Sequence, residues 1–381
     1  MLVTEQQAFD ANSPRLEVYA GEDLQPYLPA WQELANCSAE KNIFYEPCML
    51  LPALRNFDHG NVVLLLIFSG NGERLLGLFP LEYKPSYLGL PFRHYSMWRH
   101  KHCFLATPLI AAGHEYHCYQ QLFDWLKTQA KPNLFFSFQK IHGDGESYEK
   151  LKTYLHDNKC SVDLIDSYQR AFIRSGLSAE EYLAQWSKKW RKNLRKHKAA
   201  LEKLGRPHVE VLTGDSIDAA ECDAWTQQFL NLEKSGWKGR EGTALACHEN
   251  ERRFFEELTR EAASRGKLLF FRYKLDDKVI AMHIDLRSGH GAFAFKIAYD
   301  ETYGKYSPGN LLEYETLAYI LDESDLEWVG SCTVQGSTLE HLWMERRVIS
   351  YLHISRPNMA SKSAIALMAF LRKMKRRIAT W

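Results

Sequence analysis

The sequence predicts an α/β protein with mixed sheets, built from two domains that repeat one order of strands and helices. The chain has 381 residues, which exceeds the size at which a single hydrophobic core usually stops growing. Short apolar runs suited to strands alternate with segments of helical period in each half. A basic helical segment at 178–204 lies between them. We therefore expect an N-terminal domain over 1–175 and a C-terminal domain over 176–381 that includes this segment.

Composition narrows the class of protein. Hydrophobic residues make up 45% and charged residues 25% of the chain, as in ordinary globular proteins. The net charge is only +1, so an anionic partner would have to be recognised by a local cluster of charge. Eight scattered cysteines predict free thiols in a reducing compartment. The N-terminus does not resemble a signal peptide, and the longest apolar run, at 62–68, is too short to cross a bilayer. We expect a cytoplasmic protein.

The N-terminal half alternates strand and helix signals. Two apolar runs that flank a glycine turn predict a β-hairpin near its centre. The expected strands are 16–19, 62–69, 75–83, 133–139 and 162–174, and the expected helices are 23–36, 47–55, 116–129 and 146–157.

An aromatic and histidine-rich segment, 87–110, fits neither the strand pattern nor the helix pattern. It could line a pocket or form an interface. His100, His102 and Cys103 invite a metal hypothesis, but strand alternation places the two histidines on one face with no third ligand in the pattern. We therefore expect no metal site.

The segment between the halves predicts one basic helix. Ser178 and Glu181 match a capping box, and Gly205 is a suitable helix stop. Eight Lys or Arg residues lie between positions 187 and 203. Such a helix can bind nucleic acid, an anionic membrane surface or an acidic substrate. The alternative is a solvated linker helix.

The C-terminal half repeats the order of elements. The expected strands are 209–212, 268–275, 279–287, 292–299, 329–334 and 348–354. The expected helices are 219–234, 249–265, 311–322, 338–346 and 361–378.

The loop at 300–310 joins a strand to a helix and carries Gly304, Ser307, Pro308 and Gly309. A helix start presents unpaired N–H groups, and glycine lets a phosphate approach them. The loop therefore suggests a pyrophosphate cradle. The alternative is an ordinary helix start capped by Ser307 or Asn310.

The order of elements and several motifs resemble GNAT acyltransferases, in particular the CelD/BcsL-like family, which is related to the FemABX tandem-GNAT transferases. The motifs are LEKSGWKGREGTAL (232–245), KIAYDETYGKYSPGNLL (296–312), GSC (330–332) with LEHLWMERR (339–347), and the basic helix. The resemblance covers most of 178–355, whereas the first 175 residues match only in layout. It implies tandem GNAT-like domains, the N-terminal one degenerate, joined by the basic helix.

The resemblance implies an acyl-CoA donor, with acetyl-CoA expected. Pantetheine would lie along the strand before the loop, and the pyrophosphate would meet the N–H groups of the loop. The implied cofactor-binding residues are Phe295, Ile297, Tyr299, Tyr306, Ser307, Gly309, Asn310 and Leu311. The usual Arg/Gln-x-x-Gly-x-Gly/Ala motif is replaced by SPG, a departure that leaves the donor open.

Acyl transfer needs an acceptor that loses a proton and a thiolate that gains one. Asp285 is the expected base, and His283 shares its strand face because the two are two residues apart. Tyr299 or Tyr306 could protonate the departing sulfur. The alternatives are an acid at a strand end, a packed histidine and stacking tyrosines.

The loop between the first two helices of this half usually shapes the acceptor pocket in the GNAT fold. The expected substrate-binding residues are Trp237, Lys238, Arg240 and Glu241, with Lys296 positioned to neutralise an acidic acceptor. The alternative is a plain glycine-rich connection.

These features predict an N- or O-acyltransferase that acts on a sugar, a glycolipid or polysaccharide precursor, or an amine. One alternative is a FemX-like transferase that uses aminoacyl-tRNA, and another is a non-catalytic tandem-GNAT binding module. The basic helix at 187–203 could bring tRNA or an anionic membrane surface into contact, so we expect a cytoplasmic protein that can lie at the inner membrane face.

Overall fold

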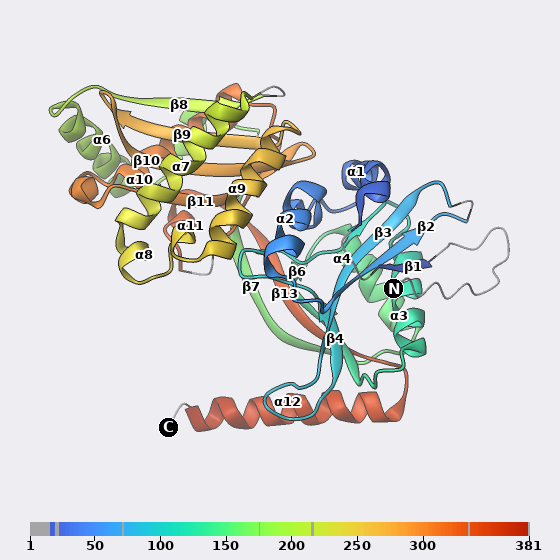
Figure 1. Cartoon of the computed structure of the whole chain (residues 1–381). Coiled ribbons are helices and arrows are strands. Elements are labelled where there is room, and N and C mark those ends of the chain that lie inside the picture. The colour runs from blue at the N-terminus through green and yellow to red at the C-terminus, as the bar shows by residue number, and fades with distance from the viewer. Residues whose placement is uncertain are drawn as a thin grey trace. The chain divides into compact units, whose positions relative to one another are not determined.

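The computed structural model of the chain describes residues 16–19, 23–70, 72–174, 176–214, 217–333 and 336–379. It has the mixed α/β fold that the sequence predicts (Figure 1). The chain divides into two compact units. Unit 1 comprises Met1–Pro47, Asp58–Gln169 and Arg347–Trp381, and unit 2 comprises Cys48–Phe57 and Arg170–Arg346.

Two segments depart from a simple division at residue 175. The helix α2 (Pro47–Phe57) precedes that point but packs in unit 2. There the Phe57 ring lies 5.0 Å from Phe254, and Arg55 pairs with Glu257 at 3.2 Å. Conversely, residues 347–381 belong to unit 1. Each unit therefore contains a segment that is remote in sequence from the rest of that unit.

Unit 1 is built on a sheet whose strand order is β1, β2, β3, β4, β6, β13, with β5 paired to β3. The β4–β6 pair is parallel and the β2–β3 hairpin is antiparallel, as predicted. The strands are β1 (Leu16–Tyr19), β2 (Val62–Phe68), β3 (Leu75–Lys84), β4 (His94–Met97), β5 (Leu109–Ile110), β6 (Phe135–His142), the first part of β7 (Val162–Arg174) and most of β13 (Glu345–Ser355). The helices are η1 (Gln25–Tyr27), α1 (Leu28–Cys37), η2 (Ile43–Tyr45), α3 (Glu115–Thr128), α4 (Glu146–Asp157) and α12 (Met359–Ala379).

Unit 2 has the strand order β8, β9, β10, β11, β12, followed by the end of β7. The strands from β8 to β11 are antiparallel, and β11 and β12 are parallel. The strands are β8 (Pro207–Thr213), β9 (Leu268–Leu275), β10 (Lys278–Ser288), β11 (Gly291–Tyr299) and β12 (Trp328–Ser331). Besides α2, the helices are α5 (Ala179–Ala184), α6 (Lys188–Glu202), α7 (Ala219–Ser235), α8 (Trp237–Arg240), η3 (Leu245–Cys247), α9 (Glu249–Ala263), η4 (Glu301–Tyr306), α10 (Pro308–Ala318), the π-turn η5 (Tyr319–Glu323) and α11 (Leu339–Leu342).

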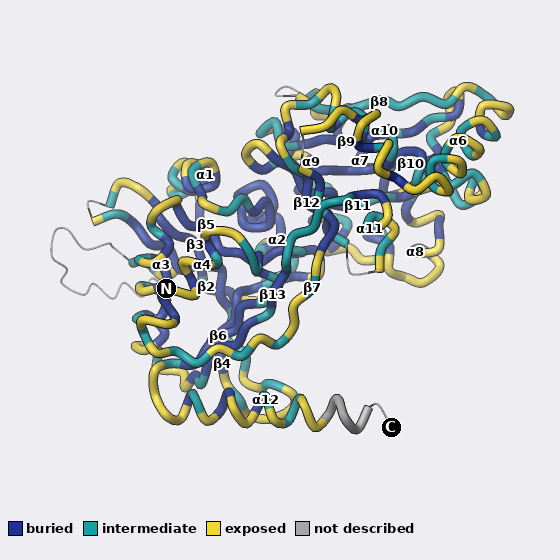
Figure 2. Tube along the Cα trace, turned by 180° about the vertical axis from the view of Figure 1, so that it is seen from behind, coloured by how far each residue is buried: buried dark blue, intermediate teal, exposed yellow. Residues whose placement is uncertain are grey.

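Helices cover both faces of the unit 2 sheet, so its strands are largely buried (Figure 2). On one face, α7 and α9 contribute Phe229 and Phe255, which pack with Phe270 of β9. On the other face, α10 contributes Leu311 and Leu312 to a cluster that includes Phe271. These two layers fix the position of β10 and β11.

Two predicted helices differ in the structure. The basic segment is two helices, because Ser187 caps a new one by accepting the Trp190 N–H at 3.2 Å. The capping box of Ser178 and Glu181, which starts α5, is confirmed. The predicted helix at 338–346 is wrong beyond residue 342, since β13 begins at Glu345. The last residue of the strand predicted at 329–334 lies outside the described residues, and β12 ends at Ser331.

Two further results concern metal ligands and membrane-spanning helices. Among the described residues, no three His, Cys, Asp or Glu side chains are grouped so that they could hold a metal ion. In the same part of the chain, no helix has both the length and the apolar character needed to cross a membrane.

Candidate functional site

The strands β11 and β12 separate halfway along β11. They pair from Gly291 to Ala294, opposite Trp328 to Ser331. The Cys332 N–H then donates to the Ala294 carbonyl at 3.3 Å, the last backbone bond between these segments in the described part of the chain. Beyond this point, residues 297–299 have no partner strand on the β12 side among the described residues.

A β-bulge lies where the two strands separate. Ile284 of β10 is opposite Lys296, whereas Asp285 is opposite Ala294, so Phe295 is an extra residue in β11. Such a bulge redirects the backbone and increases the local twist. The side chain of Phe295 is itself buried. Its contribution to a ligand site would therefore come through the backbone.

The backbone groups of Ile297 and Tyr299 face the open edge of β11. The Asp300 N–H donates to the Ile280 carbonyl of β10 at 2.8 Å. Because successive residues in a strand direct their backbone groups to opposite edges, Ile297 and Tyr299 point away from β10. Consistent with this direction, Lys238 Nζ donates to the Ile297 carbonyl at 3.4 Å. An unpaired strand edge can bind an extended ligand through main-chain hydrogen bonds.

The N-terminus of α10 presents free backbone donors beside this edge. Ser307 has a left-handed backbone (φ 52°) and forms no side-chain cap, and Pro308 has no N–H. The first helical bond runs from the Leu311 N–H to the Ser307 carbonyl at 3.1 Å. The N–H groups of Gly309 and Asn310 therefore have no acceptor among the described residues. The alternative of a side-chain cap from Ser307 is therefore wrong.

Gly309 joins the helix start to the strand edge. A Cβ atom at this position would lie 3.5 Å from Tyr299 Cδ1 and 3.7 Å from Ile297 Cδ1. The strand edge and the helix N-terminus are thus adjacent, and the missing side chain of Gly309 keeps the donors accessible. Leu311, by contrast, is buried and its N–H is used within the helix.

Two of the predicted acceptor residues are held in ion pairs. Lys238 Nζ lies 2.7 Å from Glu233 Oε1, and the other oxygen of Glu233 accepts the Leu245 N–H at 2.8 Å. Arg240 pairs at 2.7 Å with Glu301, which also accepts the Trp237 N–H. These bonds anchor α8 at the open end of β11.

The other residues predicted to contact the acceptor or the acyl donor lie around the open end of β11. Trp237, Glu241 and Tyr299 are exposed, and Tyr306 is partly buried in η4, where Lys305 lies over its ring at 4.9 Å. Lys296 Nζ lies 5.4 Å from the Phe295 ring centre. The hydrogen bonds to Glu301 from Arg240 and the Trp237 amide lower the pKa of that carboxyl.

We predict that Glu233→Gln will destabilise the protein. Glu233 is buried and accepts one charged and one backbone hydrogen bond, so loss of its charge should cost about 2 kcal/mol of unfolding free energy. Urea denaturation measures this loss. Glu301→Gln is the matched control, because its pair with Arg240 is more exposed to solvent and should contribute much less to stability. Equal midpoints for the two variants would contradict the anchoring role of Glu233.

The predicted base and its neighbour form a buried charged group. His283 Nε2 lies 2.7 Å from Asp285 Oδ1, and His283 Nδ1 lies 3.5 Å from Glu313 Oε2 of α10. The indole N–H of Trp343 donates to Glu313 Oε1 at 2.8 Å. Asp285 has no exposed surface, and its Oδ2 has no hydrogen-bond donor among the described residues.

These contacts shift the pKa values of the group. Burial opposes the charged imidazolium of His283, but the nearby carboxylates of Asp285 and Glu313 outweigh it and raise its pKa to about 9. Burial also raises the pKa of Glu313, an effect that His283 partly offsets. His283 is thus an imidazolium at neutral pH, packed beneath α10.

The helix α6 exposes basic residues on one side and packs its apolar residues on the other. Its apolar residues Trp190 and Leu194 pack against the unit 2 core, and Lys198 pairs with Glu315 at 2.9 Å. The exposed basic residues of the helix are Lys188, Lys189, Lys192, Arg195 and Lys196. The outward surface of α6 therefore offers charge without an apolar anchor.

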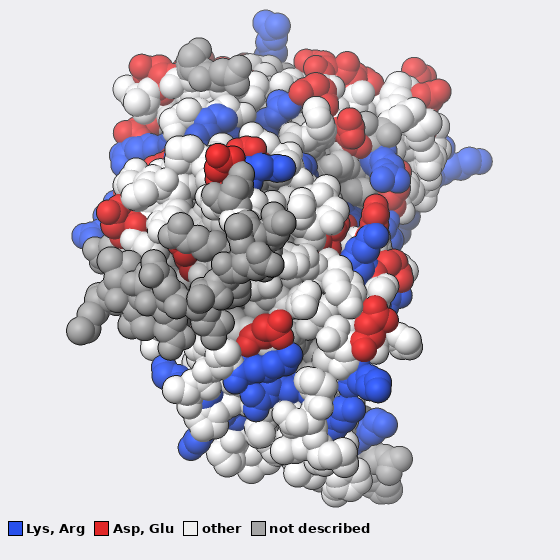
Figure 3. Space-filling model, turned by 90° about the vertical axis from the view of Figure 1, so that its right-hand side faces the viewer, with Lys and Arg blue, Asp and Glu red and all other residues white. Residues whose placement is uncertain are grey.

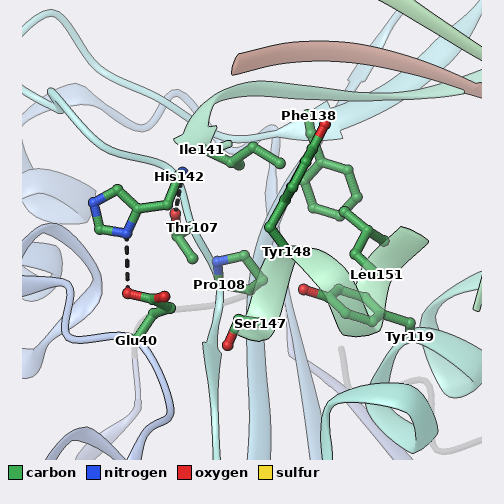
Figure 4. A pocket seen from close by; sticks show the side chains of 10 residues that line it. All are labelled: Glu40, Thr107, Pro108, Tyr119, Phe138, Ile141, His142, Ser147, Tyr148 and Leu151. Carbon is green, nitrogen blue, oxygen red and sulfur yellow. Dashed lines mark hydrogen bonds and ion pairs between the residues drawn. The ribbon is translucent and has the colours of Figure 1, made fainter. Parts of the chain in front are cut away.

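A small pocket in unit 1 was not predicted (Figure 4). His142 Nδ1 lies 3.1 Å from Glu40 Oε2, and the His142 N–H donates to Thr107 Oγ1 at 3.0 Å. Burial raises the pKa of Glu40, but His142 and Arg347 outweigh it and lower that pKa. The cavity of ≈ 10 Å³ has room for about one water molecule. As it stands, this pocket is too small for a substrate.

Comparison with known proteins defines the class. Residues 188–329 match the family model of the acetyltransferase (GNAT) domain. This range includes β10, β11 and the start of α10, the elements that carry the candidate site. The protein is thus an acyltransferase with a GNAT domain. No curated protein matches the sequence significantly.

Solved structures extend the likeness to both units at the level of fold. FemX superposes with a TM-score of 0.56 at 10% identity, over 86% of this chain and 95% of FemX. The C-terminal DUF2156 domain of a putative lysylphosphatidylglycerol synthetase from Agrobacterium fabrum gives a TM-score of 0.54 at 12% identity, over 91% and 96% of the two chains. A conserved protein of unknown function from Bacteroides thetaiotaomicron gives 0.52 at 13% identity, over 86% and 97%. At these identities the likeness establishes the fold alone.

Proposed function

We propose that this protein is an acyl-CoA-dependent N- or O-acyltransferase of the CelD/BcsL-like branch of GNAT enzymes, with acetyl-CoA as donor. Its acceptor would be a sugar, a glycolipid or polysaccharide precursor, or an amine. One observation carries the proposal: the open edge of β11 adjoins the uncapped N-terminus of α10 through Gly309. Free thiols and a CoA donor both fit the cytoplasm.

The residues at this junction suit the two ends of a CoA molecule. The backbone groups of Ile297 and Tyr299 can pair with the amides of pantetheine, because they face an edge without a partner strand. The N–H groups of Gly309 and Asn310, at the positive end of the α10 dipole, can donate to the pyrophosphate. Tyr306 and Ser307 line the approach from η4.

The transfer requires that a new bond from the acceptor to the acyl carbon forms as the carbon–sulfur bond breaks. The acceptor loses a proton and the thiolate gains one. We assign the proton donor to Tyr299, which is exposed at the end of β11, with Tyr306 as the alternative. Asp285 is the proposed base. It has no exposed surface and lies 2.7 Å from His283 Nε2, which holds the carboxylate in place. This role therefore requires a local opening that brings its Oδ2 within hydrogen-bond reach of the acceptor.

The acceptor would approach through α8, where Trp237 and Glu241 are exposed. Lys238 and Arg240 are fixed by Glu233 and Glu301, so we assign them to shaping this entrance. Unit 1 is proposed to be a degenerate GNAT-like copy. Its parallel pair β4–β6 resembles the pair β11–β12.

A second candidate function is FemX-like transfer from aminoacyl-tRNA. Two observations favour it: the fold similarity to FemX and the exposed basic residues of α6, which could contact phosphates. A non-catalytic binding module is the third candidate. An anionic membrane surface remains the alternative partner of α6, although that helix has no free apolar face.

Thermal unfolding with added ligands tests the choice of donor. A ligand at 100 times its dissociation constant stabilises the folded state by about 2.7 kcal/mol, so we expect acetyl-CoA to raise the Tm by about 5 °C. Free CoA should act similarly, whereas adenosine should not. The absence of a shift with any CoA species would refute the proposal. A shift with charged tRNA that disappears at high salt would favour the FemX-like function.

A further inference from the structure

The C-terminal helix α12 docks on unit 1 through one face. Ile365 and Met368 are buried and form a small core with Phe135 of β6. On the same face, Arg372 forms an ion pair with Asp163 of β7. These contacts fix the rotation of the helix about its axis, and therefore determine which residues point outward.

The outward face of α12 is also apolar. Leu367, Phe370 and Met374 are 49%, 57% and 45% exposed. They follow the spacing i, i+3, i+7, and at about 100° per residue they lie about 100° to 160° around the helix from Met368. A surface helix normally presents polar residues on the side opposite its docking face. The stripe therefore requires an explanation beyond folding.

A hairpin tip beside α12 exposes two more leucines. The backbone groups of Tyr87 and Leu90 pair with each other at 2.9 and 3.0 Å, so Leu88 and Gly89 form a two-residue turn. Both have positive φ, 54° and 79°, a conformation that favours Asn or Gly over leucine. Leu88 and Leu90 are 45% and 41% exposed. Phe92 of the same segment packs against the α12 core.

Basic residues lie near these apolar residues, although Arg372 is already paired with Asp163. The sequence of α12 contains six Lys or Arg residues and no Asp or Glu. Lys373 is exposed, and Lys362 lies near it in angle around the helix. Arg93 is exposed just after the hairpin. Figure 3 shows Lys and Arg atoms gathered toward the lower end of the molecule, where α12 runs in Figure 1.

We propose that α12 and the 87–92 hairpin bind the surface of an anionic phospholipid bilayer. The five exposed apolar side chains would enter the boundary between headgroups and acyl chains, and the basic residues would meet the anionic headgroups. Leu88 fits this role because its left-handed backbone is strained for a leucine, yet it presents an exposed apolar side chain at the tip. This inference concerns unit 1 and is independent of the donor site in unit 2.

Charge favours a bilayer over a second copy of the chain. Two α12 helices packed through Leu367 and Phe370 would bring two sets of basic residues together, without acidic residues on either helix to balance them. An anionic lipid surface supplies the opposite charge. The basic helix α6 is the weaker candidate for the same role, because its apolar residues are already packed.

Vesicle sedimentation with the full chain tests the proposal. One set of vesicles contains phosphatidylcholine alone, and the other contains about one third phosphatidylglycerol. We expect binding to the anionic set only. Leu367→Glu combined with Phe370→Glu should weaken binding about 100-fold or more, and Lys373→Glu should weaken it about 5-fold. Leu204→Glu is the matched control, because Leu204 is exposed to a similar extent (51%) outside this surface.

Three results would overturn the proposal. The first is a double variant that sediments with anionic vesicles as well as the wild type does, and the second is a wild type that binds both sets of vesicles equally. The third is a wild-type dimer, seen by analytical ultracentrifugation, that the double variant lacks, which would assign the stripe to a second copy of the chain. Thermal unfolding of each variant verifies that it is folded, as expected for changes at exposed positions.

Discussion

Gly309→Glu should abolish acetyl-CoA binding while leaving the protein folded. The new carboxylate would stand at the positive end of the α10 dipole, where it occupies the N–H groups that we assign to the pyrophosphate and repels the phosphates. Loss of two charge-assisted hydrogen bonds should weaken binding about 100-fold or more. Folding should not suffer, because glutamate in a first helical turn is favourable and replaces a poor helix former. Isothermal titration with acetyl-CoA measures the effect.

Two control variants show whether the effect of Gly309→Glu comes from its charge and position or from general damage to the fold. Gly309→Ala adds a Cβ atom in ordinary contact with Tyr299 and Ile297, so it should fold normally and lose less affinity than the glutamate. Gly304→Glu places the same charge on η4, where a side chain would meet nothing within 4 Å, and should retain binding. If Gly309→Glu bound acetyl-CoA with wild-type affinity, the phosphate site would not be at α10.

Asp285→Asn should cause the largest loss of stability. It removes the partner of a buried imidazolium, and breaking a buried ion pair from one side typically costs about 3–5 kcal/mol. The pKa of His283 is raised from 6.5 to about 9 in the folded state. The stabilisation is therefore fully present below pH 6.5 and is lost as the pH rises through 9. We expect wild-type stability to fall across this window, by an amount on the order of 3 kcal/mol.

Chemical denaturation at several pH values measures this behaviour. In Asp285→Asn the decline between pH 6.5 and 9 should largely disappear. Adding His283→Gln should restore part of the lost stability, because it removes the unpaired charge. Asp277→Asn, an exposed aspartate in the β9–β10 turn, is the matched control and should behave like the wild type. A stable Asp285→Asn protein with an unchanged pH profile would show that the pair does not hold the core together.

Stability and catalysis can be separated for Asp285. If it is the base, the variant should lose turnover even at temperatures and pH values where it is fully folded, with little change in acetyl-CoA affinity. If it only holds His283 in place, activity should recover with folding. The same protein samples serve both measurements.

Much of the fold follows from local pattern. The β2–β3 hairpin was predictable because its strands are apolar runs that flank a glycine turn. The capping box at Ser178 follows from two residues three positions apart. The junction of β11 and α10 was also predictable as strand, glycine-bearing loop and helix. Each of these features depends on neighbours within one or two turns of the chain.

Other features have no local signal. The break between α5 and α6 occurs in a continuous helical pattern, and it is stabilised when the buried Trp186 donates to the Leu342 carbonyl at 2.7 Å, over 150 residues away in sequence. The helix predicted at 338–346 ends at Leu342, and β13, which pairs with β6 from Ile349 onward, begins at Glu345. The position of α2 in unit 2 depends on contacts with α9. Periodicity does not encode such contacts.

The candidate site likewise has features that follow from local sequence and features that depend on remote contacts. The sequence by itself determined that a strand ends at Tyr299 and that a helix with a glycine in its first turn follows, since alternation, proline and glycine act locally. Only the tertiary structure decided that β12 leaves β11 after Ala294, that Glu233 holds Lys238, and that Glu313 and Trp343 enclose His283. The physical reason is distance along the chain: hydrogen bonds and ion pairs between remote residues form only when packed layers bring them together.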